Sequence, residues 1–453
     1  MIYADGRLRS GLALVTDASG MILRLSPDPA DRARAVRLAG RAMLPGFVNV
    51  HSHSFQRAIR GRTEHRTQAT KDTFWTWREK MYHAALGLTP EGIYATARMC
   101  FLEMALAGIT TVGEFHYLHH APDGSRYPDP NFLAKEVVRA ARDVGLRIAL
   151  LQTGYARSGW QREPNPGQIR FLYRSTGEFL DNLTALRADL GKAYAANEAW
   201  VGLAPHSLRA VTLADFKQLK AYAATHRLPV HMHMSEQRAE NEACRLENGN
   251  TPVALLAAEG LLDQGFTAIH AVHVTPDEIQ ALGRAGATVC ACPTTERNLG
   301  DGIVPADQML AQGVRLAAGS DSQTQIAPLE DVRQLEYHLR LQREERAILS
   351  AGPHPDDLSA TLLDAATANG ARSLFAPGGS LAIGRPADFV TVDLRDPSLS
   401  GGGQSLAAIV FGMERTAIRD VVVGGRTIVR DGRHAAQDAI VTEFEKVQAG
   451  LWG

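Results

Sequence analysis

The sequence predicts an α/β protein: a (β/α)8 TIM-type barrel with a small composite β-sandwich built from both chain ends. Three observations support this fold. Apolar strand-like runs alternate with helix-like segments through the middle of the chain, both chain ends are rich in strands, and reactive side chains gather at one end of the central runs. Continuous apolar strands separated by helices are typical of a parallel sheet that is covered on both faces.

Composition bounds the class of protein. The 453 residues can bury one large core with a smaller appendage, and 45% hydrophobic with 21% charged residues is ordinary for a globular protein. Lys plus Arg number 48 and Asp plus Glu 49, so we expect no nucleic-acid partner and no membrane partner. The four cysteines are too few and too scattered for a disulfide framework, and the first residues lack the apolar core of a signal peptide. We therefore expect a cytoplasmic protein.

The two chain ends resemble each other in their pattern of short β-like runs. Short β-like runs at 12–15 and 21–23 are separated by a turn, and similar runs stand at 388–392, 420–423 and 426–429. Few helical patterns interrupt them. The predicted domain organisation is an N-terminal part of the β-sandwich at 1–44, a metal-dependent barrel at 45–375 and a C-terminal part of the β-sandwich at 376–453.

Eight strands are predicted for the barrel, and the segments between them, such as 89–106 and 131–144, have helical periodicity. An open, doubly wound sheet is the alternative, but no GxGxxG motif follows a strand. A P-loop and a GxSxG nucleophile elbow are also absent from the sequence. The predicted strands are Leu44–His51, Thr110–Phe115, Arg147–Thr153, Val201–Pro205, Pro229–Met234, Phe266–His273, Ala287–Cys292 and Val314–Gly319.

Reactive side chains follow these strands at their carboxyl ends, which is where such a barrel carries its chemistry. Random placement would scatter them over both strand ends and the helices. The residues concerned are His51, His53, Tyr117, His206, Arg209, His233, Glu236, His270 and Asp321. Their clustering predicts one active site at this end of the barrel.

Four of these residues form a candidate metal site. His51 and His53 lie two apart on a strand, so their side chains project to the same side and can converge on one ion. Adding His233 and Asp321 gives four N and O ligands, which together with a water molecule suit one divalent metal ion, most simply Zn²⁺. Ligand type alone leaves iron and other divalent ions open. His231 is expected to point deeper into the barrel as a core residue.

Glu236 comes three residues after His233, which places a carboxylate beside the ion. It can carry protons between a metal-bound water and a leaving nitrogen. A second metal ion would need a bridging ligand, commonly a modified lysine on the fourth strand, and Val201–His206 contains none. One metal ion is therefore expected.

The motif set resembles the amidohydrolase superfamily, in its mononuclear deaminase branch: HxH after the first strand, HxxE at the fifth, a histidine at the sixth and an aspartate at the eighth. Gly379–Asp388 resembles the segment by which such chains re-enter the small β-sandwich. The resemblance covers nearly the whole chain and implies a homodimer.

A narrower resemblance, to the formimidoylglutamate deiminase subfamily, is carried by the blocks 49–57, 74–82, 113–120 and 231–237. It implies hydrolysis of N-formimino-L-glutamate to N-formyl-L-glutamate and ammonia in histidine degradation. Asp321 would act as metal ligand and base, Glu236 would protonate the departing nitrogen, and His270 would hold and polarise the attacking group.

Such a substrate is a dicarboxylate, so its pocket needs cationic or bidentate donors. Arg209 is the best candidate, and Gln56, Tyr117 and His206 are further substrate-binding candidates. Trp75 and Trp77 could close over the pocket, but aromatic residues at this spacing more often serve helix packing, so neither is counted among the site residues. The loop at 156–175 matches no pattern that we recognise, so its role is left open.

Two rival functions remain. A deaminase of a purine or adenosine derivative would use the same metal site but would need aromatic stacking and amide donors for a flat ring. A non-catalytic, amidohydrolase-like scaffold protein would have lost metal ligands, and this chain keeps the complete set.

Overall fold

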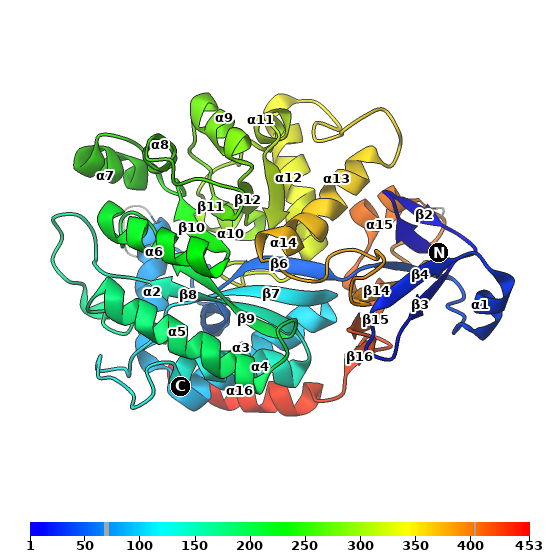
Figure 1. The fold of residues 1–453 in the computed structure, drawn as a ribbon, viewed down its shortest axis with the longest axis horizontal. Helices are drawn as coiled ribbons and strands as arrows, with labels where there is room; N and C mark the ends of the chain where they lie inside the picture. Colours follow the sequence, from blue (N-terminus) through cyan, green and yellow to red (C-terminus); the bar gives the residue numbers. More distant parts are fainter. Residues whose placement is uncertain (68–71, 403–404) are drawn as a thin grey trace.

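The computed structural model describes residues 1–67, 72–402 and 405–453. Eight parallel strands form the central sheet in the order β13-β12-β11-β10-β9-β8-β7-β6, with helices around it (Figure 1). The strands are β6 Phe47–Ser52, β7 Ile109–His116, β8 Arg147–Gly154, β9 Ala199–Pro205, β10 Val230–Met234, β11 Phe266–His270, β12 Thr288–Ala291 and β13 Arg315–Ala318.

The sheet closes on itself where its first and last strands meet. Ser52 forms a parallel bridge with Asp321, just after β13. The backbone N–H of His53 donates to the carbonyl of Asp321 (3.1 Å), and the N–H of Asp321 donates to the carbonyl of His51 (2.9 Å). The predicted barrel is therefore confirmed, and its closure joins the HxH motif directly to the aspartate.

Helices follow most strands, and their ends obey the expected capping chemistry. Thr89 caps α3 by accepting from the N–H of Gly92, and Gly145 ends α4 with φ +97°. The helical elements around the barrel are η1 Ser54–Ile59, α2 Phe74–Gly87, α3 Pro90–Leu106, α4 Phe132–Val144, η2 Pro166–Gln168, α5 Thr176–Ala193, α6 Leu213–His226, α7 Arg238–Asn248, α8 Pro252–Ala258, α9 Pro276–Ala285, α10 Pro293–Leu299, α11 Ala306–Ala311, α12 Pro328–Arg343, α13 Asp357–Ala365 and α14 Ala368–Ser373.

The two chain ends form one small β domain beside the barrel, with the N-terminal strands next to the C-terminal ones (Figure 1). Its larger sheet has the order β17-β16-β15-β14-β5-β1-β2, and the hairpin β3-β4 packs over it around Ile22 and Met43. The remaining elements are β1 Ile2–Ala4, β2 Arg7–Arg9, β3 Ala13–Thr16, β4 Ile22–Ser26, α1 Pro29–Arg34, β5 Arg41–Pro45, β14 Phe389–Asp393, α15 Leu406–Gly412, η3 Arg415–Ala417, β15 Ile418–Val423, β16 Arg426–Arg430 and β17 Arg433–His434.

Two predicted strands differ from the observed ones. The strand expected at Leu44–His51 is two strands in two sheets, β5 and β6, which meet at Gly46. A Cβ at Gly46 would lie 2.3 Å from side-chain atoms of Thr110, so only glycine fits at this crossing. The strand expected to reach His273 ends at His270, where the backbone turns to a positive φ of 69°.

The last helix, α16 Gln437–Trp452, packs on the barrel, although 376–453 was expected to belong to the β-sandwich. Its buried face carries Ile440 and Phe444, four residues apart, as an amphipathic helix requires. Gln448 Nε2 and Trp452 Nε1 both donate to the carbonyl of Ala58 (3.2 and 3.1 Å). The end of the chain therefore contacts the segment that follows the HxH motif.

A buried ion pair joins the two parts of the molecule. Arg147 on β8 donates to both carboxylate oxygens of Asp388 (2.7 and 3.0 Å), and both side chains are at most 4% exposed. The N–H of Gly424 also donates to Asp388 (2.6 Å). The small domain is thus fixed to the barrel by a fully hydrogen-bonded carboxylate.

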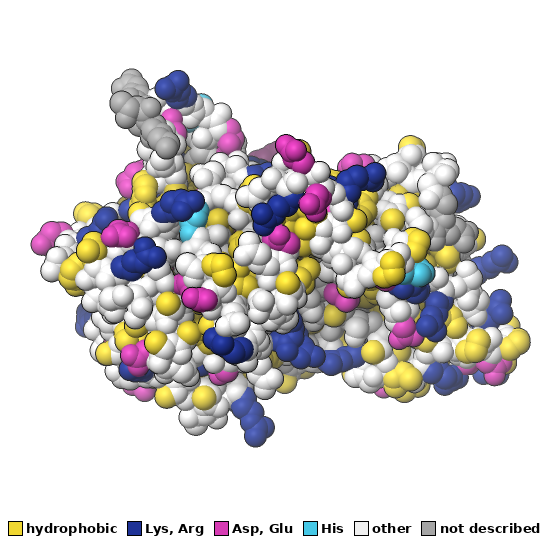
Figure 2. Space-filling model, turned by 90° about the horizontal axis from the view of Figure 1, so that it is seen from above, with side chains coloured by type: hydrophobic (Ala, Val, Ile, Leu, Met, Phe, Trp, Pro, Cys, Tyr) yellow, Lys and Arg dark blue, Asp and Glu magenta, His cyan; other side chains and the backbone are white. Residues whose placement is uncertain are grey.

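The outer surface carries both signs of charge. Lys/Arg and Asp/Glu side chains are interspersed over the face seen in Figure 2. No helix in the described part of the chain has the length and apolar character needed to cross a membrane.

Candidate active site

His51 and His53 stand at the carboxyl end of β6, where the chain turns into η1. His53 Nδ1 lies 2.9 Å from the carbonyl oxygen of Phe115, and His233 Nδ1 lies 3.1 Å from that of His206. These contacts make each Nδ1 a donor and leave the two Nε2 atoms as lone-pair carriers. The two rings are therefore turned in the way that metal ligation requires.

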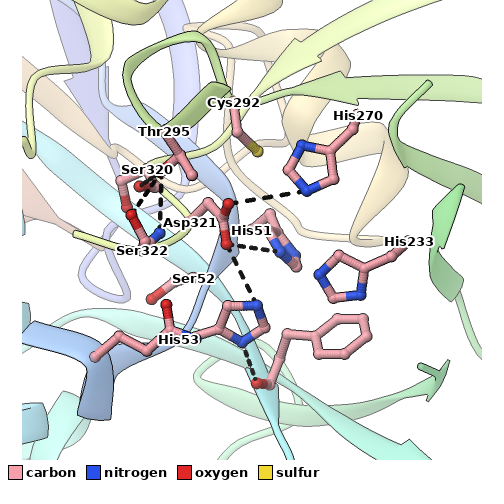
Figure 3. A network of polar contacts seen from close by, with 12 residues as sticks. His51, Ser52, His53, His233, His270, Cys292, Thr295, Ser320, Asp321 and Ser322 are labelled. Atoms are coloured by element: carbon pink, nitrogen blue, oxygen red, sulfur yellow. Dashed lines mark hydrogen bonds and ion pairs between the residues drawn. The ribbon is translucent and has the colours of Figure 1, made fainter. Parts of the chain in front are cut away.

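The side chains of His51, His53, His233 and Asp321 converge on one point (Figure 3). Their ligand atoms all lie within 4.8 Å of one another, and all four residues are buried. Asp321 Oδ1 is 3.3 Å from Nε2 of His51 and 3.3 Å from Nε2 of His53. The structure brings the four predicted ligands together.

The donor set fits a divalent cation. Within the described part of the chain, Nδ1 of His51 is buried without a hydrogen-bond partner and its Nε2 has only the 3.3 Å contact to Asp321, which is costly unless something else binds there. Burial lowers the pKa of His51 to about 3 and also lowers the pKa of His53, so both imidazoles are neutral and can coordinate. The chain therefore contains a buried His/Asp metal-binding group.

Glu114, on β7, supports the HxH motif from behind. Its carboxylate accepts hydrogen bonds from Ser52 Oγ (2.6 Å), Ser54 N (2.7 Å) and Ser54 Oγ (2.7 Å). These three bonds fix the backbone on either side of His53. Burial raises the pKa of Glu114 to about 7.

His270 connects three carboxylates. Its Nε2 lies 3.8 Å from both Glu236 and Asp321, and its Nδ1 lies 3.1 Å from Glu296 on α10. Burial alone would lower the pKa of His270, but the charge of Glu236 and the hydrogen bond to Glu296 outweigh it and raise the pKa. Glu296 in turn accepts from the N–H of Cys292 (2.8 Å), so its position is fixed.

The backbone is strained at these strand ends. Ser235, His270 and Asp321 have φ values of +51°, +69° and +49°, in the left-handed region that non-glycine residues seldom adopt. Such outliers cluster at functional sites because the surrounding structure holds side chains in positions the chain would not otherwise choose.

A cleft of about 710 Å³, measured out to its open mouth, leads from solvent to the metal-binding group. All the predicted site residues line it except His51, which lies deeper. Trp75 and Trp77, whose role the sequence left open between the pocket and helix packing, line the cleft as well. The predicted residues at the cleft are His53, Gln56, Tyr117, His206, Arg209, His233, Glu236, His270 and Asp321.

Gln56 and Tyr117 form a pair beside the metal-binding group. Gln56 Nε2 donates to Tyr117 Oη (2.9 Å), and Gln56 Oε1 is buried without a partner. The Tyr117 ring lies 5.1 Å from that of His53, and the ring of His206 lies 4.7 Å from that of His233. Gln56, Tyr117 and His206 therefore lie beside the metal-binding group and line the same cleft.

Two arginines, Arg78 and Arg209, line the cleft. Arg209 Nη1 contacts Tyr155 Oη at 3.4 Å, and the Arg78 guanidinium lies 4.6 Å from the centroid of the Trp75 ring. Burial, and to a smaller extent the positive charge of Arg209, lower the pKa of Arg78. Among the described residues, neither guanidinium forms an ion pair with a carboxylate.

Several cleft residues were not predicted from the sequence: Arg78, Tyr82, Tyr155, Phe171 and Glu240. One signal was available. Trp75, Arg78 and Tyr82 follow one another at spacings of three and four, so they share one face of α2. The spacing does not indicate whether this face of α2 contacts the cleft or the protein core.

Comparison with known proteins agrees with this site. The amidohydrolase family model matches residues 42–428, and the chain belongs to the amidohydrolase family. A crystal structure of an amidohydrolase from Brucella melitensis has 34% sequence identity and a TM-score of 0.87, covering 98% of this chain and 96% of that one.

Two curated relatives bear on the chemistry. The formimidoylglutamate deiminase of Pseudomonas aeruginosa is 42% identical over 437 residues, which is 96% of this chain and 94% of that protein. The 5-methylthioadenosine/S-adenosylhomocysteine deaminase of Natronomonas pharaonis is 28% identical over 453 residues, 98% of this chain and 94% of that protein. The predicted resemblance to formimidoylglutamate deiminases is confirmed.

Proposed function

We propose that this protein is a hydrolase that converts N-formimino-L-glutamate and water to N-formyl-L-glutamate and ammonia. One observation carries the proposal: the cleft that ends at the metal-binding group is lined by two arginines that form no ion pair with a carboxylate of the described residues. A substrate with a reactive amidine at one end and two carboxylates at the other matches this arrangement. The 42% identity to a formimidoylglutamate deiminase supports it.

His51, His53, His233 and Asp321 would hold one divalent ion, with zinc as our choice because neutral imidazoles and a carboxylate suit it. Such an ion lowers the pKa of a bound water molecule and so makes the attacking oxygen available near neutral pH.

The chain's own groups then move the protons. Asp321 takes a proton from the attacking water as its oxygen forms a bond to the formimino carbon, and Glu236 gives a proton to the imino nitrogen. His270, 3.8 Å from both carboxylates, holds the attacking oxygen in place. The resulting intermediate carries one hydroxyl and one amino group on the former formimino carbon. Asp321 passes on the first proton and Glu236 delivers a second one to the amino nitrogen. As the C–N bond breaks, the nitrogen leaves as ammonia, the hydroxyl gives up its proton and the C=O bond of the formyl product forms. Glu236 and Asp321 are therefore the catalytic acid and base.

Arg209 and Arg78 would bind the carboxylates, while Gln56, Tyr117 and His206 contact the substrate near the metal. Guanine, adenosine and 5-methylthioadenosine have no carboxylate for the two guanidinium groups, and S-adenosylhomocysteine has one carboxylate where N-formimino-L-glutamate has two. Deamination of a purine or adenosine derivative is the second candidate function. The 28% identity to a 5-methylthioadenosine/S-adenosylhomocysteine deaminase supports it. A homodimer and a cytoplasmic location remain predictions.

The test is ammonia release by the metal-loaded enzyme with N-formimino-L-glutamate, guanine, adenosine and 5-methylthioadenosine. We expect turnover of the formimino compound alone. Arg209→Ala and Arg78→Ala should each raise KM by about tenfold or more, because each removes a charge-assisted contact, with metal content unchanged. Arg187→Ala, on the exposed face of α5, is the matched control. Turnover of a purine alone would refute the proposed substrate.

A further inference from the structure

Gln168 lies behind the cleft, in the loop at 156–175 that the sequence left unassigned. It is 1% exposed, and its Nε2 donates to Tyr82 Oη (2.7 Å) and to Tyr155 Oη (2.6 Å). Both tyrosines line the cleft. One buried amide therefore joins two cleft hydroxyls that come from different elements, α2 and the end of β8.

A hydrogen-bond chain on its far side supports this orientation of the amide. The N–H of Asn165 donates to Ser158 Oγ (2.8 Å), and Ser158 Oγ donates to Gln168 Oε1 (2.7 Å). Because the serine oxygen already receives a backbone hydrogen, its own hydrogen is available for the amide oxygen. With Oε1 occupied in this way, both amide hydrogens face the tyrosines.

The consequence concerns the tyrosine hydroxyls. Each phenol oxygen accepts from Gln168, so the hydrogen of each hydroxyl stays free to donate into the cleft. Tyr155 Oη also accepts a hydrogen bond from Arg209 Nη1 at 3.4 Å. The Tyr155 oxygen thus accepts two hydrogen bonds, and its hydroxyl hydrogen is left to donate. Burial raises the pKa of Tyr82, so its phenol is protonated at neutral pH.

The loop is held firmly enough to impose this pattern. Arg170 is fully buried and donates to the carbonyls of Ala85 and Leu88 at the end of α2, and its Nε donates to the carbonyl of His120 (2.7 Å). Gln168 is therefore fixed relative to the helix that carries Tyr82.

The charges around the two hydroxyls favour an anion. The Arg78 guanidinium lies 5.3 Å from the Tyr82 ring centroid, and Arg209 contacts Tyr155. The cleft also contains the carboxylate of Glu240, which accepts from the N–H of Glu236 (3.0 Å) and so has a backbone partner.

We propose that Gln168 is a positioning residue that keeps Tyr82 and Tyr155 as hydrogen-bond donors, so that this end of the cleft selects a dicarboxylate. The identity of the reacting substrate rests on the proposed function, whereas the donor pattern does not. A carboxylate accepts from two phenols and two guanidinium groups at once. The acceptor atoms of a purine ring are neutral and point in different directions, so a purine cannot replace the paired anionic oxygens of a carboxylate here.

The experiment measures binding of glutarate, a plain dicarboxylate, to the metal-loaded protein by titration calorimetry, with butyrate as the monocarboxylate comparison. Tyr82→Phe and Tyr155→Phe each remove one oxygen and should each weaken glutarate binding by about tenfold. Gln168→Glu should weaken it further, because a carboxylate at 168 would draw both phenol hydrogens away from the cleft. KM for N-formimino-L-glutamate should rise in parallel while kcat stays within about twofold.

Tyr173→Phe is the matched control, since Tyr173 lies in the same loop but its buried hydroxyl is outside the cleft. It should bind glutarate as the unaltered protein does. Unchanged glutarate binding in both tyrosine variants would overturn the inference, whatever Gln168→Glu does. Weakened glutarate binding without any turnover of N-formimino-L-glutamate would instead overturn the proposed function and leave the donor pattern in place.

Discussion

At the scale of single residues, buried carboxylates orient the groups that act. Glu114 fixes the backbone around the HxH motif through Ser52 and Ser54, and Glu296 holds the ring of His270. Neither carboxylate is needed as a metal ligand. Each determines instead how another side chain points, which is how supporting residues tune metal sites.

We expect Glu114→Gln to weaken metal binding by about 10–100-fold. An amide at this position can accept at only one of the two oxygen positions, so it would place an N–H₂ group against the Ser52 hydroxyl or the two donors of Ser54. Titration with zinc in a metal buffer gives the affinity directly. Glu178→Gln, which alters an ion pair on the surface with Arg126, is the control, and equal affinities in the two variants would contradict the role given to Glu114.

The sequence revealed the ligands but missed part of the substrate cleft, for a definite reason. His51, His53 and Asp321 follow strands, and the strand direction alone says at which end of the barrel they lie. Arg78 lies on a helix, and its spacing from Trp75 shows that they share a face without showing what that face meets. That depends on how α2 packs against the loop at 156–175, which no local pattern encodes.

At the scale of elements, the buried carboxylate of Asp331 joins the helices α10 and α12. Asp331, in the first turn of α12, accepts from the N–H (3.1 Å) and Oγ1 (2.8 Å) of Thr294 on α10. It is 2% exposed, and burial raises its pKa to about 8. The folded protein therefore keeps this carboxyl protonated through neutral pH.

This shift gives the contribution of Asp331 to stability a pH dependence. The unfolded chain loses the proton near the ordinary pKa of 3.8, whereas the folded chain holds it until about 8. The folded state then binds more protons between these values, so stability falls as pH rises through that window. Below it both states are protonated and the contribution is constant.

Asp331→Asn should remove this pH dependence. Between about pH 4 and pH 8, the urea midpoint of the variant should rise relative to that of the unaltered protein. Outside this range the difference between the two midpoints should stay constant. Unfolding curves of both proteins at pH 5, 6.5 and 8 check it. Parallel midpoints at the three pH values would show that Asp331 is ionised in the folded protein.

Strand prediction succeeded where strands are continuous apolar runs and failed at their junctions. The barrel strands near 147–153 and 201–205 were predicted within one or two residues. Leu44–His51 was predicted as one strand although Pro45-Gly46 is a turn signal, and the crossing between two sheets at Gly46 depends on Thr110, over sixty residues away. The short β1 and β2 have too few residues for a recognisable alternation.

At the scale of the whole molecule, the barrel and the small domain depend on each other. Asp388, next to β14, accepts hydrogen bonds from Nε and Nη2 of Arg147 on the barrel strand β8. The helix α16 follows the strands of the small domain and packs on the barrel. The family resemblance implied the composite domain, but the final helix was missed, although Ile440, Phe444, Val447 and Leu451 follow its apolar face.

Asp388→Asn should lower the free energy of unfolding by about 3–5 kcal/mol, because it leaves a buried guanidinium without its counter-charge. Chemical denaturation followed by far-UV circular dichroism measures the change. Asp431→Asn is the control: that carboxylate is 60% exposed and pairs with Arg41, so its loss should cost at most about 1 kcal/mol. A similar, small effect of both substitutions would refute the structural role of the buried pair.

The composite sheet also has a consequence for synthesis on the ribosome. β5 pairs with β14, which follows it by more than 340 residues. At 5–20 residues per second, the edge of β5 therefore stays unpaired for roughly 17–70 s during synthesis. An unpaired edge invites pairing with another nascent chain. Arg7 and Arg9 on β2 and Arg41 on β5 place positive charge on this waiting segment, and like charges on neighbouring chains of a polysome repel each other.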